Sequence, residues 1–152
     1  MNENEKELTD FLMRAKRATY AAGMQPVNPS RLASHDLPYS EGLWQYLDSY
    51  LGGLKFLGEE AVWYDSRPVW GMNYYGFILV ASMPEGLPQF LKDALLHVPA
   101  EAPYRGPAAY VAGPFVYRCQ WEGQLSCFWG TEWIEQEGEK VYELRFHGGE
   151  VL

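Results

Sequence analysis

Hydrophobic positions near the N-terminus follow the period of an α-helix. They fall on one face of such a helix: Leu8, Phe11, Leu12, Ala15 and Thr19. Charged residues such as Lys16 fill the remaining positions, and Gly23 and Pro26 then end the pattern. A second, shorter stripe follows Pro88 and consists of Phe90, Leu91, Ala94 and Leu95. We therefore expect two amphipathic helices, one at the N-terminus and one in the middle of the chain.

The rest of the chain contains short runs rich in Trp, Tyr, Phe and Val, which favour β-strands. These runs predict six strands, at residues 43–51, 54–64, 68–80, 115–121, 124–136 and 140–147. The last three strands are separated by turns at Glu122-Gly123 and at Glu137-Gly138-Glu139. Residues 24–42 and 98–114 are rich in Pro and Gly, so we expect irregular connections there.

An internal repeat links the two groups of strands. Seven residues of the first group recur 72 positions later: Phe56, Gly58, Glu60, Val62, Val69, Trp70 and Gly76 correspond to Phe128, Gly130, Glu132, Ile134, Val141, Tyr142 and Gly148. We expect a single α+β domain over residues 1–152, built from two helix-strand-strand-strand halves at 4–80 and 87–149. Its six strands would be mainly antiparallel, with one helix covering a face in each half. A chance likeness between two aromatic hairpins is the alternative explanation.

The alternation of side chains along the strands also predicts their register. If a three-residue loop joins each pair, the facing residues are Val62–Trp70, Glu60–Met72 and Gly58–Tyr74 in the first half, and Ile134–Tyr142, Glu132–Leu144 and Gly130–Phe146 in the second. Each strand glycine then lies opposite an aromatic ring, which covers the bare backbone.

The same register places acidic side chains on the apolar face. Glu60 and Glu132 alternate with aromatic positions, and Asp48 shares a face with the aromatic residues of its own strand. A buried carboxylate is costly unless it is hydrogen-bonded or paired. One explanation is structural: Tyr or Trp donors, Arg105 or Arg118 satisfy each glutamate. The other is functional: an aromatic pocket has an acid at its base.

A pocket of that kind favours a cationic or hydrogen-bond-donating small molecule, held by ring faces and one carboxylate. The candidate ligand-binding residues are Glu60, Glu132, Asp48, Trp44, Tyr46, Trp70, Tyr74, Tyr117 and Arg105. Our leading hypothesis is therefore a non-enzymatic small-molecule-binding or sensor module, with no catalytic residue and no cofactor.

Two other classes of function remain open. A small hydrolase or isomerase could use Glu60, Asp48 or His147 as acid or base, provided that two of these groups converge in one cleft. An interaction protein could bind another chain through Trp63 and Trp133, which occupy the face opposite the predicted core. A homodimer is one form that such an interaction could take.

Charge and composition narrow the partners. The chain has 12 basic and 20 acidic side chains, a net charge of -8, which opposes binding to nucleic acid. No apolar run is long enough to span a membrane, and the first residues lack the pattern of a signal peptide, so we expect a cytoplasmic protein. Cys119 and Cys127 are expected to be thiols, and no spacing typical of a metal site is present.

Several motifs resemble those of a known family. They are the runs Leu51–Glu60 (LGGLKFLGEE), Trp70–Gly76 (WGMNYYG) and Pro103–Pro107 (PYRGP), followed by Tyr142-Glu143-Leu144 and His147-Gly148-Gly149. Together they resemble a bacterial family of domains of unknown function, whose members occur alone or behind a helix-turn-helix module. The resemblance covers nearly the whole chain and implies no activity. A weaker likeness, at the level of fold, is to the duplicated effector-binding domains of multidrug-responsive regulators.

Overall fold

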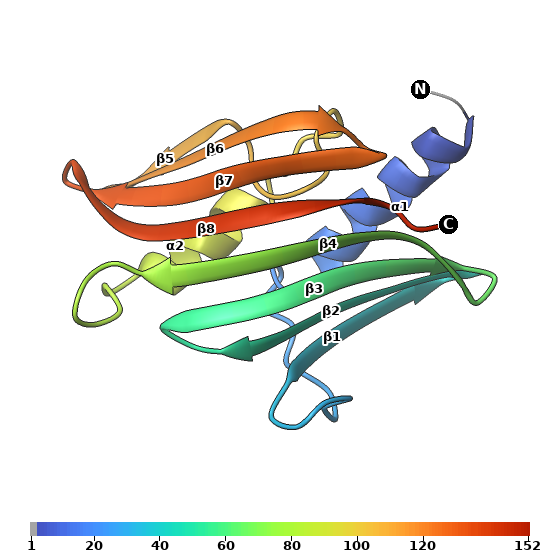
Figure 1. Ribbon diagram of the computed structural model, residues 1–152. Coiled ribbons are helices and arrows are strands. Elements are labelled where there is room, and N and C mark those ends of the chain that lie inside the picture. The colour runs from blue at the N-terminus through green and yellow to red at the C-terminus, as the bar shows by residue number, and fades with distance from the viewer. Residues whose placement is uncertain (1–2) are drawn as a thin grey trace.

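The computed structural model describes residues 3–152. Met1 and Asn2 lie outside the described residues, and with them the start of the segment that we judged not to be a signal peptide. Within residues 3–152 the chain forms two helices and eight strands (Figure 1). Their bounds in chain order are α1 Glu3–Ala18, β1 His35–Glu41, β2 Trp44–Gly52, β3 Lys55–Tyr64, β4 Arg67–Ile78, α2 Leu87–Leu95, β5 Ala109–Ala112, β6 Phe115–Gln124, β7 Cys127–Gln136 and β8 Glu139–Glu150.

The strands form one open antiparallel sheet in the order β1-β2-β3-β4-β8-β7-β6-β5. Both helices lie against the same side of this sheet, which we call the inner face; the other side is the outer face (Figure 1). The α+β class with two helices is therefore confirmed. From each edge to the centre the strands follow chain order, β1 to β4 on one side and β5 to β8 on the other, and β4 pairs with β8 at the centre. Duplication of the halves remains a prediction.

The expected number of strands was wrong, because β1 and β5 lie within the two segments expected to be irregular. Both are edge strands, and each pairs with one neighbour only. An edge strand tolerates proline, since one of its sides needs no hydrogen bonds, and β1 contains Pro38 opposite Leu47. The turn expected at Glu122-Gly123 was also misplaced: both residues belong to β6.

The predicted register is confirmed at all six residue pairs. The connecting loop is shorter than expected. Asp65 and Ser66, with φ of 48° and 64°, form a two-residue turn between β3 and β4, and a β-bulge after Val62 supplies the missing position. The turn between β7 and β8 has the same combination, with its bulge after Ile134. Paired positive φ values suit such hairpins because they match the twist of the strands.

The core lies between the helices and the inner face. Phe11 and Leu12 of α1 are fully buried there, as are Trp70 of β4 and Phe128 of β7. Full burial of a Phe or Leu side chain contributes about 1.5–3 kcal/mol, so this aromatic layer is a major source of stability. The two strand glycines, Gly58 and Gly130, are covered by the rings of Tyr74 and Phe146, which a β-carbon at either position would overlap.

Candidate functional site

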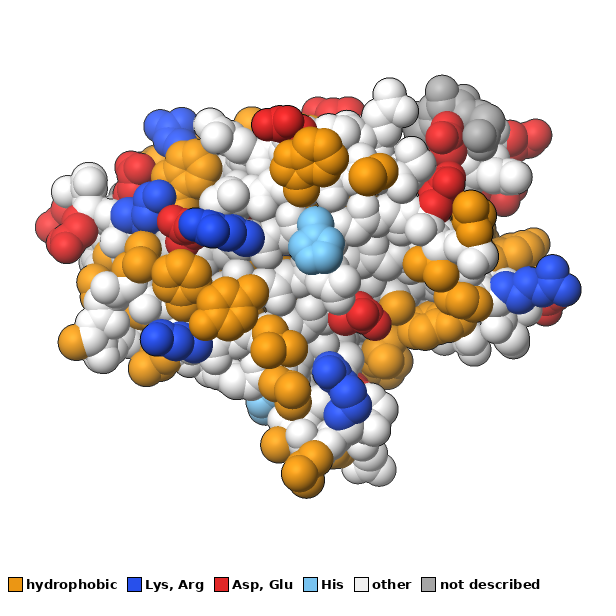
Figure 2. Space-filling view, in the orientation of Figure 1, with side chains coloured by type: hydrophobic (Ala, Val, Ile, Leu, Met, Phe, Trp, Pro, Cys, Tyr) orange, Lys and Arg blue, Asp and Glu red, His pale blue; other side chains and the backbone are white. Residues whose placement is uncertain are grey.

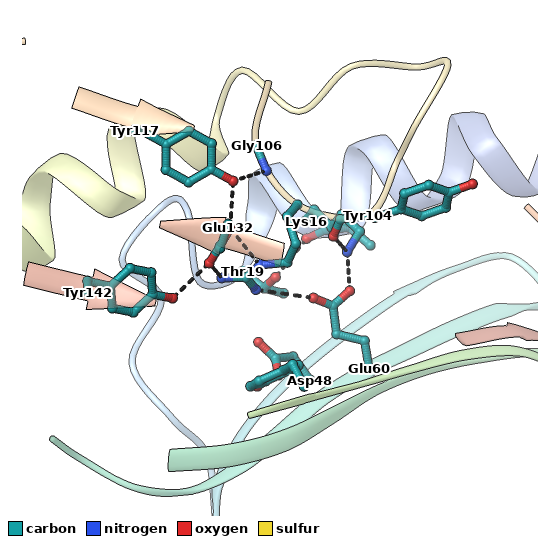
Figure 3. Close-up of polar contacts among 12 residues, drawn as sticks. Lys16, Thr19, Asp48, Glu60, Tyr104, Gly106, Tyr117, Glu132 and Tyr142 are labelled. Carbon is teal, nitrogen blue, oxygen red and sulfur yellow. Dashed lines mark hydrogen bonds and ion pairs between the residues drawn. The ribbon is translucent and has the colours of Figure 1, made fainter. Parts of the chain in front are cut away.

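Five charged side chains are buried together between the helices and the inner face. This buried charge cluster consists of Lys16, Asp48, Glu60, Arg105 and Glu132, each at most 8% exposed. They come from α1, β2, β3, the connection between α2 and β5, and β7, respectively. Figure 3 labels all of them except Arg105. Because charges are costly to bury unless they are paired, the pairing within the cluster decides what each group can do.

Glu132 has a complete set of donors. Arg105 binds both of its carboxylate oxygens, with Nη2–Oε1 at 2.6 Å and Nε–Oε2 at 3.1 Å. The Tyr117 and Tyr142 hydroxyls donate to the same carboxylate at 2.5 and 2.7 Å, and the Gly106 amide donates to the Tyr117 oxygen at 2.9 Å (Figure 3). Burial opposes the charge of Arg105, but the Glu132 carboxylate raises its pKa well above the usual value. Such a network is typical of a structural role.

Glu60 has a different partner. The Lys16 ammonium donates to Glu60 Oε2 and to the backbone oxygen of Tyr104 at 2.8 Å, and Arg105 Nη1 lies 3.9 Å from Glu60 Oε1. Burial lowers the pKa of Lys16, although the Glu60 charge acts in the opposite direction. Lys16 and Glu60 thus neutralise each other and attach α1 to the sheet.

Asp48 is the third carboxylate of the cluster. It lies directly opposite Glu60 in the pairing of β2 with β3, and the Tyr74 hydroxyl donates to its Oδ1 at 2.5 Å. Burial, followed by repulsion from Glu60, raises the pKa of Asp48 to about 7. Since Lys16 and Arg105 are matched by the two glutamates, ionised Asp48 leaves the buried charge cluster with one negative charge in excess.

A cavity of about 200 Å³ opens directly at Asp48, between α2 and the first half of the sheet. Asp48, Arg105 and Tyr74 are buried residues of its lining and form its base. Its aromatic walls include Tyr20, Tyr50, Phe56 and Tyr142, and α2 contributes Leu87 and Leu91. Exposed residues of the lining mark its mouth: His35, Gly52, Gly53, Met83 and Pro88.

Seven of the nine predicted site residues fall into three groups. Asp48, Tyr74 and Arg105 line the cavity, whereas Glu60 and Tyr46 line a much smaller hollow beside it, which Asp48 and Arg105 also border. Glu132 and Tyr117 are bonded to each other and to Arg105 or its neighbouring backbone, and they do not line the cavity.

The other two predicted residues lie elsewhere. Trp70 is fully buried and its indole NH donates to the Leu125 carbonyl at 3.1 Å. Trp44 stacks on Phe11 with ring centroids 5.2 Å apart and borders a separate surface hollow.

Sequence reasoning missed Lys16 and the four aromatic walls of the cavity, Tyr20, Tyr50, Phe56 and Tyr142. The charge of Lys16 predicts a place on the polar faces of the first helix, although Lys16 follows Leu8 and Leu12 at intervals of four, the spacing of one helix face. Tyr142 could have been found from the predicted register, which already placed it on the inner face. Tyr20 lies two residues beyond Ala18, the last residue of α1, where helical periodicity gives no guidance.

Three residues named by the alternative hypotheses lie on the outer face, namely His147, Trp63 and Trp133. His147 is exposed in β8 between Asn73 and Trp129, so it does not converge with Asp48 and Glu60. Trp63 and Trp133 are half-buried, and the Lys140 ammonium lies 5.2 Å from the centroid of the Trp133 ring. Figure 2 shows this face, on which hydrophobic side chains are interspersed with Lys, Arg, Asp and Glu.

Three further properties concern residues 3–152 only. Neither α1 nor α2 is long and apolar enough to cross a lipid bilayer. In this part of the chain no three His, Cys, Asp or Glu side chains are grouped so that they could hold a metal ion. Cys119 is a buried thiol and Cys127 an exposed one.

Comparison with known proteins gives one match. Neither the curated proteins nor the solved structures contain a significant relative, so the likeness to effector-binding domains has no support from these comparisons. A family model matches residues 48–151, a range that begins at Asp48 and contains Glu60, Arg105 and Glu132. The chain that forms this cavity and its buried charge cluster therefore belongs to the family described as a domain of unknown function, DUF5680.

Proposed function

We propose that the protein is a non-enzymatic small-molecule-binding module, and that its ligand occupies the cavity between α2 and the sheet. The observation that carries the proposal is the combination of an aromatic cavity with a carboxyl group at its base. Asp48 and Tyr74 form that base, and the mouth is open to solvent beside Met83, which is 39% exposed. Concave apolar sites with a few convergent polar groups are typical of ligand-binding sites.

The size of the cavity suits a small ligand. An apolar cavity of about 150 Å³ is sufficient for benzene, so about 200 Å³ accommodates a single ring with a short side chain. The proposal also includes a duplication of the two halves. Only the first half carries Asp48, so only that half would form the ligand site. The mirrored strand order and the repeated register of β3–β4 and β7–β8 support the duplication.

A specific observation also favours an enzymatic alternative. With its pKa raised to about 7 by burial and by Glu60, Asp48 could exchange protons as a general acid or base of a hydrolase or isomerase. The second group that such a mechanism needs is harder to supply. Glu60 is held by Lys16, and His147 is on the outer face. We therefore rank binding above catalysis.

The proposal can be tested by closing the cavity. Single-ring compounds that raise the melting temperature of the wild type should lose this effect in Met83→Trp, because the larger side chain fills the mouth. Leu43→Trp is the matched control, since Leu43 is also exposed, at 55%, but does not line the cavity. If no single-ring compound binds at millimolar concentration, or if both variants respond like the wild type, the cavity is not a ligand site.

A further inference from the structure

We propose that the ligand of this cavity is an organic monocation with a single ring, whose ammonium group takes the place of the proton on Asp48. This inference rests on the proposed function and specifies the chemical class of the ligand. It follows from three properties of the site. The buried charge cluster has one negative charge in excess, both of its cations are already paired with glutamates, and aromatic walls surround Asp48.

The charges of the cluster leave room for one more cation. Arg105 donates hydrogen bonds from Nε and Nη2 to Glu132, and Lys16 is bound to Glu60. With all groups ionised, two cations therefore face three carboxylates. The third, Asp48, is the one that borders the cavity, so the excess charge can be neutralised there by a proton or by a positively charged ligand.

The same arrangement disfavours an anion. Arg105 borders the cavity and is the group that would attract one. Two of its nitrogens are already engaged by Glu132, and a carboxylate ligand would also lie close to Asp48. A buried anion without a free partner is strongly disfavoured.

The walls of the cavity suit an aromatic amine. Tyr74 fixes the Asp48 carboxyl through its hydroxyl and is itself part of the lining. Phe56 lies 6.2 Å from Tyr74 and 6.3 Å from Tyr142 between ring centroids, so three rings surround the space beside the acid. Aromatic rings attract cations through their faces and bury an apolar ring at their edges.

Exchange of a proton for a cation makes binding depend on pH. The groups around Asp48 are Glu60 on β3, Tyr74 on β4, Arg105, and Lys16 and Tyr20 at the end of α1; Tyr46 and Tyr50 share its strand, and His35 of β1 lies at the mouth. Burial and the Glu60 charge raise the pKa of Asp48 to about 7. Above that pH Asp48 is ionised and available to a cation; below it, the ligand has to displace a proton.

Three probes of similar shape test the inference: 2-phenylethylamine, 2-phenylethanol and phenylacetate. Their dissociation constants are measured by titration calorimetry at pH 5.5 and pH 8. We expect the amine to bind most tightly at pH 8 and about 10- to 30-fold more weakly at pH 5.5, because affinity falls up to tenfold per unit below the pKa of Asp48. The neutral alcohol should bind weakly and equally at both values.

Two variants distinguish an effect of the Asp48 carboxylate on affinity from an effect of the protein's overall negative charge. Asp48→Asn should weaken binding of the amine at least tenfold at pH 8 and leave the alcohol unchanged. Glu59→Gln is the matched control: it removes one carboxylate next to Glu60 in sequence, but from an exposed position that does not line the cavity. It should leave all three probes unchanged. The comparison of the two pH values uses the wild type, so it holds even if Asp48→Asn fails to fold.

The outcomes distinguish this inference from the proposed function. If amine and alcohol bind equally, without dependence on pH or on Asp48, the cavity binds small molecules but the cationic class is wrong. Preference for phenylacetate would also overturn the inference and point to Arg105 as the recognising group. If none of the three probes binds, both the inference and the proposed function fail.

Discussion

Glu60 and Glu132 occupy corresponding places in the mirrored sheet, yet their surroundings differ. Each lies on the inner face of the strand next to a central one, opposite Met72 of β4 and Leu144 of β8, respectively. On the other side, Glu132 faces Cys119, which is neutral, whereas Glu60 faces Asp48. Glu132 receives hydrogen bonds from Arg105 and two tyrosines; Glu60 receives them from Lys16 and from the Tyr46 hydroxyl.

This difference teaches that one buried carboxylate can have its charge fully matched while its counterpart, beside a second acid, lies in a cluster with an unmatched charge. A single acid with matched donors closes a network and leaves no charge over. With a second acid beside the first, the negative charges outnumber the cations that the helices and loops provide. The difference between Cys119 and Asp48 thus separates the half whose charges are matched from the half that, in our proposal, receives the ligand.

The largest expected effect comes from breaking the complete network. Glu132→Gln should destabilise the protein by about 3–5 kcal/mol, because it leaves Arg105 buried without its main partner. Glu60→Gln should cost less, since Lys16 retains the Tyr104 carbonyl and its pKa is already lowered by burial. Urea denaturation of both variants at pH 7 measures the difference. Equal losses would mean that the two glutamates have equivalent roles.

Removing the excess negative charge of the buried charge cluster should instead stabilise the protein. The pKa of Asp48 is raised from 3.8 to about 7, so the folded state holds this proton more tightly than the unfolded state, and stability decreases as the pH rises between these values. Asp48→Asn should therefore stabilise the protein at pH 8, by about 2–4 kcal/mol less the cost of an imperfect amide contact with Tyr74. Its free energy of unfolding should vary less with pH from 4 to 7. Denaturation series at pH 4, 6 and 8 test this, and an unchanged pH profile would contradict it.

The smallest effects concern the covered glycines. Gly58→Val and Gly130→Val should each cost about 1–3 kcal/mol, because the new side chain collides with Tyr74 and Tyr50 at the first site and with Phe146 and the Gln120 carbonyl oxygen at the second. Removing the colliding ring with Phe146→Ala should recover part of the loss at Gly130. Recovery with Tyr74→Ala should be smaller, since Tyr74 is also the donor to Asp48. Chemical denaturation of single and double variants decides the point; strictly additive losses would contradict the proposed contacts.

The register of the hairpins could be predicted from the sequence because it depends on local periodicity and on turn length. Gly58 and Tyr74 face each other whether the loop has three residues, or two residues and a bulge. The edge strands could not be predicted in the same way. β1 is polar and contains Pro38, and its pairing with β2 is visible only in three dimensions.

The candidate site was predictable only in part, for a related reason. Periodicity placed Asp48, Glu60 and Glu132 on the inner face, but it could not say which cation each would meet. Arg105 reaches Glu132 from an irregular connection 27 residues away in sequence. Lys16 is the harder case, because a lysine on an amphipathic helix normally faces water. Its burial becomes intelligible only once Glu60 is known to lie opposite α1.

The attachment of α1 through Lys16 bears on where this protein can be cut. The recognised family region starts at residue 48 and so omits α1, β1 and the residues between them. A fragment of residues 48–151 would retain Asp48 and Glu60 but lose the ammonium that neutralises Glu60, together with Tyr20 from the wall of the cavity. It would also expose the apolar surface that Phe11 and Leu12 cover. The boundary of the recognised region is therefore not the boundary of the folding unit, and the N-terminal helix belongs in any minimal version of the domain.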